Sequence, residues 1–99
     1  MKLKLNITPK ANADIVGIWD YTVIEHGLAA ADAYVTDLDG AMQRLLDFPR
    51  LGADCSAIRN GYRCIRSGSH SIYYIAHKGG IEIMRVLHTS MDARARLRE

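Results

Sequence analysis

The sequence predicts an α+β fold, in which a helical hairpin packs on a mainly antiparallel sheet of four strands and a short helix ends the chain. Three observations predict it. The N-terminal segment alternates between polar and apolar residues, two stretches with helical spacing follow, and three runs rich in β-branched and aromatic residues come last. A chain of 99 residues suffices for one modest core and is too short for two. We therefore expect residues 1–99 to form one domain.

The N-terminal strand is predicted by strict alternation over residues 2–8. Leu3, Leu5 and Ile7 share one face, which is the pattern of a half-buried strand. Lysines on the opposite face suit the edge of a sheet, where charge discourages pairing with another chain. The polar residues of that face are Lys2, Lys4, Asn6 and Thr8.

The first helix is predicted over residues 9–26. Thr8 is a favourable N-cap, and Pro9 suits the first helical position because its missing N–H has no partner there. Gly27 is placed as a C-terminal capping glycine. The residues recurring at spacings of three and four are Ala11, Ile15, Ile18, Trp19, Thr22 and Val23.

A second helix follows at once, and Pro49 ends it. The short connection makes the two helices antiparallel neighbours. Gly40 lies inside the helix at a cost of about 1 kcal/mol relative to Ala, so we expect it to face the first helix closely. Residues 48–58 show no period and are expected to form a loop. The apolar face of the second helix comprises Ala31, Tyr34, Val35, Leu38, Ala41, Met42 and Leu45.

The last third of the chain predicts an antiparallel meander. Its runs span residues 60–66, 69–75 and 81–88, separated by Ser67-Gly68 and by Lys78-Gly79-Gly80. Glycine supplies the positive φ that tight hairpin turns need. Residues 89–92 are predicted to start a last helical turn.

Both faces of this meander are apolar near the middle, although one helical hairpin covers a single face. Either the C-terminal segment folds over the second face or a partner does, and we infer a protein-binding surface there. By strand parity, the sets expected on opposite faces are Ile72, Tyr74 and Ala76 against Tyr73, Ile75 and His77, and Ile81, Ile83 and Leu87 against Met84 and Val86.

Composition excludes several classes of protein. The formal net charge of +2 is too small to imply nucleic-acid binding by itself, although Arg94, Arg96 and Arg98 form a local basic cluster. The spacing of Cys55 and Cys64 predicts no zinc site, and reduced thiols are the simpler expectation for them. No apolar core of a signal peptide or membrane span is present. We expect a cytoplasmic protein without cofactor or metal.

The meander carries a resemblance. Its order and spacing resemble the ParE family of the ParE/RelE toxin superfamily, and the order of elements agrees over nearly the whole chain. The residues that carry the resemblance are Pro49, Gly52, Arg59-Asn60-Gly61-Tyr62-Arg63, Gly68-Ser69-His70-Ser71-Ile72-Tyr73-Tyr74 and Ile81-Glu82-Ile83-Met84-Arg85-Val86-Leu87-His88-Thr89-Ser90-Met91-Asp92.

The resemblance implies a type II toxin that poisons DNA gyrase by binding, without catalytic residues, and so blocks replication. It also implies neutralisation by a ParD-like ribbon-helix-helix antitoxin in a hetero-oligomer, with no sequence-specific DNA binding by this chain. Family toxicity is linked to the C-terminal segment, so Arg94, Arg96 and Arg98 are expected to bind the target. On the uncovered sheet face, the residues expected to contact the antitoxin are Tyr73, Ile75, Met84, Arg85 and Val86.

Two alternatives stay open. One is a ribosome-dependent mRNA endonuclease of the RelE type, whose base, phosphate-binding group and acid would be sought among Arg63, Arg85 and His88. The other is an inactive toxin-like partner or co-repressor. Arg85 itself has two readings, an internal ion pair with Asp92 or Glu82, or a bidentate contact to an antitoxin carboxylate.

Overall fold

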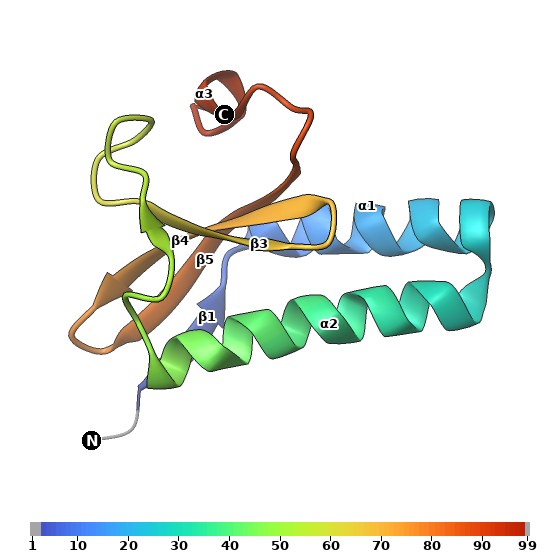
Figure 1. The fold of residues 1–99 in the computed structure, drawn as a ribbon, viewed down its shortest axis with the longest axis horizontal. Helices are drawn as coiled ribbons and strands as arrows, with labels where there is room; N and C mark the ends of the chain where they lie inside the picture. The colour runs from blue at the N-terminus through green and yellow to red at the C-terminus, as the bar shows by residue number, and fades with distance from the viewer. Residues whose placement is uncertain (1–2, 99) are drawn as a thin grey trace.

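The computed structural model describes residues 3–98 and confirms the α+β class. Two long helices pack on one face of a sheet, and a short helix lies across the other face (Figure 1). In chain order the elements are β1 (Lys4–Ile7), α1 (Pro9–His26), α2 (Leu28–Asp47), β2 (Ala53–Asp54), β3 (Arg63–Ser67), β4 (His70–His77), β5 (Gly80–His88) and α3 (Ala93–Arg96).

The sheet has five strands in the order β1-β5-β4-β3-β2 within the described residues. β1 runs parallel to β5, and the other neighbours are antiparallel. The predicted sheet of four strands is therefore wrong by one strand. The extra strand is β2, which pairs with β3 through Ala53↔Cys64 and Asp54↔Arg63. Two exposed residues carry no alternation, so no sequence period marks this strand.

The N-terminal elements follow their sequence signals. In β1, Lys4 and Asn6 are exposed, whereas Leu5 and Ile7 pack against the core. The hydroxyl of Thr8 accepts a hydrogen bond from the Ala11 N–H at 3.2 Å, as an N-cap does. Lys2, which was expected on the exposed face of the strand, lies outside the described residues.

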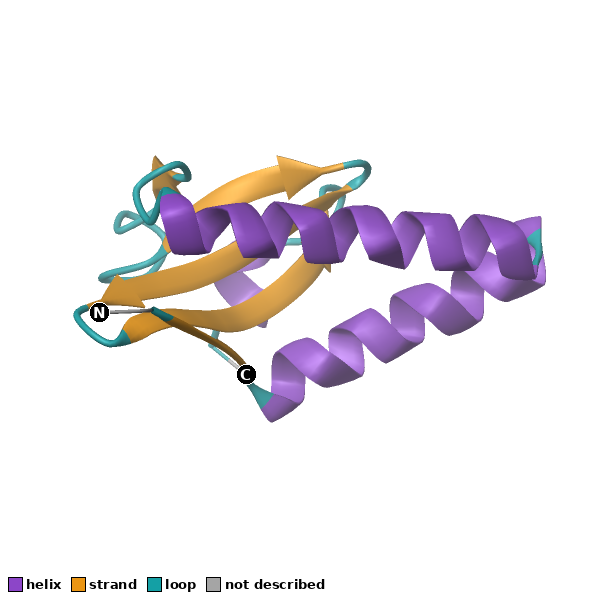
Figure 2. Cartoon of the chain, turned by 90° about the horizontal axis from the view of Figure 1, so that it is seen from below, coloured by secondary structure: helices purple, strands orange, loops and turns teal. Residues whose placement is uncertain are grey.

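Helix α1 ends where the capping glycine predicts, and Gly27 has a φ of 91°. The helices α1 and α2 lie side by side as an antiparallel hairpin, whose far end projects beyond the sheet (Figures 1 and 2). The expectation that Gly40 faces α1 is wrong. Gly40 is exposed, and a Cβ at this position would meet no atom within 4 Å.

A first core fills the space between the helical hairpin and the sheet. Its largest fully buried side chains are Tyr74, Leu38, Leu45, Ile72, Ile81 and Ile83. The Tyr74 hydroxyl donates to the Pro49 carbonyl at 2.9 Å and accepts from the Gly52 N–H at 2.8 Å. The polar end of this buried ring therefore fastens the connection between α2 and β2 to the sheet.

The chain itself covers the second face of the sheet. Residues 55–62, here called the cover segment, and the C-terminal residues 93–97 pack there, and α3 is seen on this side in Figure 1. Tyr73, Leu87 and Leu97 are 7%, 3% and 4% exposed. Of the two alternatives, cover by the C-terminal segment is the one observed, and the inferred exposed protein-binding face is wrong in that respect.

A β-bulge in β5 changes the expected faces. Tyr73 lies opposite Arg85, and the next residue, Tyr74, lies opposite Ile83, so Met84 is the additional residue. After the bulge Val86 packs in the first core and Leu87 in the second. Strand parity predicted the reverse for both, because parity assumes an unbroken ladder.

Candidate partner-binding groove

The outer edge of β5 is paired with two different elements in turn. Up to Ile83 its neighbour is β1. Beyond that point Thr8 and the N-terminal half of α1 provide hydrogen-bond partners for the backbone of β5. The hydroxyl of Thr8 donates to the Met84 carbonyl at 3.2 Å, and the Val86 N–H donates to Oδ2 of Asp14 at 3.0 Å. A helical side chain thus satisfies a strand group that would otherwise lack a partner.

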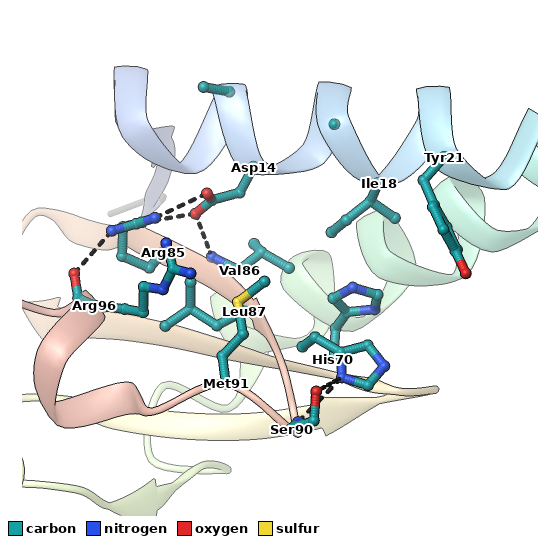
Figure 3. A pocket seen from close by; sticks show the side chains of 13 residues that line it. Asp14, Ile18, Tyr21, His70, Arg85, Val86, Leu87, Ser90, Met91 and Arg96 are labelled. Carbon is teal, nitrogen blue, oxygen red and sulfur yellow. Dashed lines mark hydrogen bonds and ion pairs between the residues drawn. The ribbon is translucent and has the colours of Figure 1, made fainter.

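Asp14 also binds Arg85 in a bidentate ion pair. Nε of Arg85 lies 2.8 Å from Oδ2 of Asp14, and Nη2 lies 3.0 Å from Oδ1. The two side chains are 12% and 16% exposed. Nη1 of Arg85 donates to the Arg96 carbonyl at 2.9 Å. One guanidinium therefore joins α1, β5 and α3, and the parallel pair of hydrogen bonds fixes its orientation (Figure 3).

A pocket of about 470 Å³ opens beside this ion pair, between α1 and the end of β5. We call it the α1–β5 groove. Figure 3 shows Asp14, Ile18 and Tyr21 along its α1 side and Met91 and Ser90 on the other. Its lining residues are Ala13, Asp14, Gly17, Ile18, Tyr21, His70, Arg85, Val86, Leu87, His88, Ser90, Met91 and Arg96.

Two histidines lie at one end of the groove. His70 and His88 are opposite each other on β4 and β5, with ring centroids 5.2 Å apart. Nδ1 of His70 lies 2.5 Å from the Tyr34 hydroxyl. Burial, and then the neighbouring His88, lower the pKa of His70. Nδ1 of His88 accepts from the Ser90 N–H at 3.0 Å. Both rings are thus held by groups of this chain.

Exposed apolar side chains continue the groove along the projecting hairpin. Tyr21, Ile24 and Leu28 are 64%, 81% and 58% exposed. Tyr21 and Ile24 follow Gly17 at spacings of four and three and therefore lie on the same side of α1. Leu28 is the first residue of α2, directly after the connection at Gly27. Together with the groove these side chains form a long apolar strip, which a soluble protein rarely exposes without a partner. We call these three residues the hairpin strip.

The comparisons with known proteins bear on this arrangement. The sequence profile described as "ParE toxin of type II toxin-antitoxin system, parDE" matches residues 5–93. Toxin ParE1 of Mycobacterium tuberculosis is 38% identical over 93 residues, covering 93% of this chain and 95% of that protein. The chain belongs to the ParE toxin family.

Further relatives agree. Toxin ParE1 of Caulobacter vibrioides is 36% identical over 91 residues, covering 92% of this chain and 94% of that toxin. Among solved structures, a chain of the chromosomal ParDE toxin–antitoxin system from P. aeruginosa matches with a TM-score of 0.76 and 25% identity. That match covers 88% of this chain and 96% of the other. Within residues 3–98, no helix is long and apolar enough to span a membrane.

The three residues considered as nuclease candidates, Arg63, Arg85 and His88, do not meet in one site. Arg63 lies opposite Tyr74 on the helix face, whereas Arg85 lies opposite Tyr73 on the other face. Nη1 of Arg63 donates to the Gly52 carbonyl at 2.8 Å, and Nδ1 of His88 lies 2.7 Å from the Ser90 hydroxyl. The groove brings Arg85 and His88 to one pocket without Arg63. In the part of the chain described, no group of three or more His, Cys, Asp or Glu is placed to hold a metal ion.

The structure divides the residues expected to contact an antitoxin. Tyr73, Ile75 and Met84 belong to the second core beneath the chain's own cover. Arg85 and Val86 line the α1–β5 groove. The internal partner of Arg85 is Asp14. Glu82 instead lies near His77, and Asp92 caps α3 by accepting from the Arg94 N–H at 3.1 Å.

The residues expected to bind the target lie at the C-terminus. The side chains of Arg94, Arg96 and Arg98 are exposed. Nη1 of Arg94 lies 3.4 Å from the Ala57 carbonyl, which attaches the start of α3 to the cover segment. The cluster is therefore a basic surface carried on a segment that is itself docked on the sheet.

Sequence reasoning missed the α1 side of the groove. Asp14 is an ordinary acidic residue on a helix, and nothing local indicates that it binds Arg85, 71 positions away. Tyr21 and Ile24 did carry a signal. They are large apolar residues outside the helical stripe that faces the core, and such residues on a surface helix indicate a second contact face.

Proposed function

We propose that this ParE family toxin inhibits DNA gyrase by binding it, and that a ParD-like antitoxin neutralises it by occupying the α1–β5 groove and the hairpin strip. The observation that carries the antitoxin proposal is the apolar strip of Tyr21, Ile24 and Leu28, exposed beside a groove. The neighbour from P. aeruginosa, described as a ParDE toxin–antitoxin system, supports a partner of this kind.

The chemistry of the groove favours an amphipathic peptide segment. Its walls offer Ile18, Tyr21 and Met91 to apolar side chains, and its rim offers Arg96 and His88 to carboxylates. A helix laid in such a groove buries one apolar face and keeps its charges at the rim. The antitoxin contact is thereby proposed on α1 and the end of β5, with Arg85 and Val86 in the wall.

Binding rather than catalysis is favoured by the state of the candidate catalytic groups. Arg63 and Arg85 point to opposite faces of the sheet, and each donates to a carbonyl or carboxylate of this chain. A general base or phosphate-binding group must reach the substrate in one site. The proposal therefore assigns no catalytic residue and places the gyrase contact on Arg94, Arg96 and Arg98.

The test is gyrase-catalysed supercoiling of a relaxed plasmid, titrated with the purified chain in the presence and absence of the antitoxin encoded beside it. We expect inhibition with accumulated cleaved DNA, reversed by the antitoxin. Ile24→Glu should still inhibit gyrase but bind the antitoxin at least tenfold more weakly, because a carboxylate replaces an apolar contact in the strip. Leu51→Glu, at an exposed apolar residue that lies between α2 and β2 and does not line the groove, is the control.

Each part of the proposal has its own contrary result. Unaffected supercoiling would reject the gyrase hypothesis, and cleavage of ribosome-bound mRNA that is lost in Arg63→Ala or His88→Ala would establish the nuclease. Equal antitoxin affinity for Ile24→Glu and wild type would remove the antitoxin from the hairpin strip. Normal growth on expression of the chain alone would indicate the inactive partner.

A further inference from the structure

The two cysteines lie against each other beneath the cover of the second sheet face. Cys55 directly follows β2, and Cys64 is the second residue of β3 and lies opposite Ala53. Their Sγ atoms are 2.6 Å apart, and both thiols are free. This separation is shorter than ordinary non-bonded contact between sulfurs, and a disulfide S–S bond measures about 2.05 Å. Bond formation therefore requires only a small movement.

We propose that Cys55 and Cys64 form a reversible intramolecular disulfide, a redox site that fastens the cover segment to the sheet. Both sulfurs belong to the second core, together with Tyr73. The backbone already holds the geometry, because the Cys55 N–H donates to the Tyr62 carbonyl at 2.7 Å. The proposal is independent of the toxin's target and of its antitoxin.

The fastened segment holds the C-terminal cover in place. Nη1 of Arg59 donates to the Leu97 carbonyl, and Nη1 of Arg94 lies 3.4 Å from the Ala57 carbonyl. Tyr62 of the same segment packs in the second core with Leu97. A bond at Cys55 is thus connected to the docking of α3 through the contacts that join the two covers.

The oxidant is a peroxide, and the reaction balances in two steps. The Cys55 thiolate attacks hydrogen peroxide, the O–O bond breaks, and sulfenic acid and hydroxide form. The Cys64 thiol then displaces the sulfenic hydroxyl, so the S–S bond forms and water leaves with the thiol proton. Overall two thiols lose two hydrogens, and one peroxide becomes two waters.

The environment assigns the order of attack. Burial, and then the hydrogen bond with Cys55, raise the pKa of the Cys64 thiol to about 12. Cys64 is therefore the less suitable thiol for the first attack, since the thiolate is the form that attacks peroxide, and the proposal gives that step to Cys55. Cys55 is buried, with 9% exposure, and Cys64 is partly exposed, so little of either thiol meets solvent. We expect slow oxidation to a stable product rather than the rapid response of a dedicated sensor.

The experiment treats the reduced, purified full chain with hydrogen peroxide, alkylates the remaining thiols, and measures the intact mass without reductant. We expect a monomer two hydrogens lighter with no alkylated cysteine, restored by dithiothreitol. Closing this loop should raise Tm by about 10 °C and slow trypsin cleavage after Arg59 several-fold. Cys64→Ser and Cys55→Ser are matched controls, in which peroxide should raise neither Tm nor protease resistance.

The contrary results are distinct. Two fully alkylated thiols after peroxide treatment, a disulfide-linked dimer, or sulfinic acid at Cys55 would each reject the intramolecular bond. A disulfide that forms without changing Tm or the rate of cleavage after Arg59 would reject its role in fastening the cover segment. The wild-type protein is compared before and after oxidation without any substitution, so the test still decides the matter if either serine variant fails to fold.

Discussion

At His70, contacts from α2 and β5 meet on one imidazole ring. Tyr34 of α2 holds Nδ1 at 2.5 Å, and the His88 ring of β5 lies edge-on at 5.2 Å. Burial is the largest cause of the lowered pKa of His70 and His88 the next, while Asp14 acts in the opposite direction. The folded chain therefore favours the neutral ring, and protonation of His70 opposes folding.

We expect the free energy of unfolding to decrease as the pH falls below about 6.5, the ordinary pKa of His70. In that range the unfolded chain binds a proton that the folded chain does not yet bind, so acid favours unfolding until the lower, folded pKa is reached. Urea denaturation at several pH values measures the slope. His70→Gln should reduce the slope of the free energy of unfolding against pH. His26→Gln, at an exposed histidine at the end of α1, should leave that slope unchanged. Equal slopes in the two variants would contradict this origin.

At the scale of elements, the Asp14–Arg85 pair explains how α1, β5 and α3 hold together. Asp14 accepts from the Arg85 guanidinium and from the Val86 N–H, and Arg85 donates onward to the Arg96 carbonyl. Because both charges are mostly buried, neither is well solvated alone. Removal of one partner leaves the other charge uncompensated, which costs more than the pair contributes by itself.

Asp14→Ala should destabilise the fold by about 3 kcal/mol, measured as the free energy of unfolding in urea. The double variant Asp14→Ala/Arg85→Met should recover much of this loss, because no unpaired charge is then buried. Asp20→Ala, an exposed acidic residue of the same helix, should change stability by less than about 0.5 kcal/mol. Equal decreases in the free energy of unfolding for Asp14→Ala and Asp20→Ala would show that the ion pair contributes no more to stability than an exposed carboxylate.

Elements with a local signal were predictable, and elements specified by distant contacts were not. Thr8-Pro9 and Gly27 mark both ends of α1, and their capping acts within a few residues. β2 has two residues and exists only by pairing with β3. The bulge at Met84 has no marker in the sequence, although it decides that Val86 and Leu87 exchange faces.

The groove shows the same division. The sequence predicted that Arg85 has a charged partner, because it lies among apolar residues of a strand and a charge in such a position requires one. Its partner Asp14 was not predicted, since the two residues are 71 positions apart and the sequence alone offers several other carboxylates as candidates. The hairpin strip carries a readable pattern, whereas the pocket beside it arises only when α1 and β5 meet.

At the scale of the whole molecule, one sheet separates two cores of different construction. The helical hairpin covers the first core with long, regular elements, while the second core is covered by the cover segment and a few C-terminal residues. Short covers bury less apolar area and open more easily. The arginines proposed to contact gyrase are carried on the less firmly held side, where Leu97 is the buried apolar anchor and hydrogen bonds from Arg85, Arg59 and Arg94 add to it.

Leu97 is 4% exposed and packs in the second core with Tyr73 and Leu87. Leu97→Ala should reduce the free energy of unfolding by about 2–3 kcal/mol, because it leaves a cavity beneath a short cover. Before global unfolding, α3 should open, so trypsin should cleave after Arg94 faster than in wild type. Arg98→Ala, the exposed neighbour, should not alter stability measurably.

The position of Leu97 also gives the proposed gyrase contact a structural control. If Arg94, Arg96 and Arg98 bind gyrase as a docked surface, Leu97→Ala should weaken gyrase inhibition several-fold at temperatures where circular dichroism shows an intact fold. Antitoxin binding should weaken less, because it is proposed mainly along α1 and the hairpin strip, and Arg96 is the residue of α3 that lines the groove. Unchanged inhibition in a variant whose C-terminal segment is demonstrably loosened would mean that gyrase does not require the docked arrangement of these arginines.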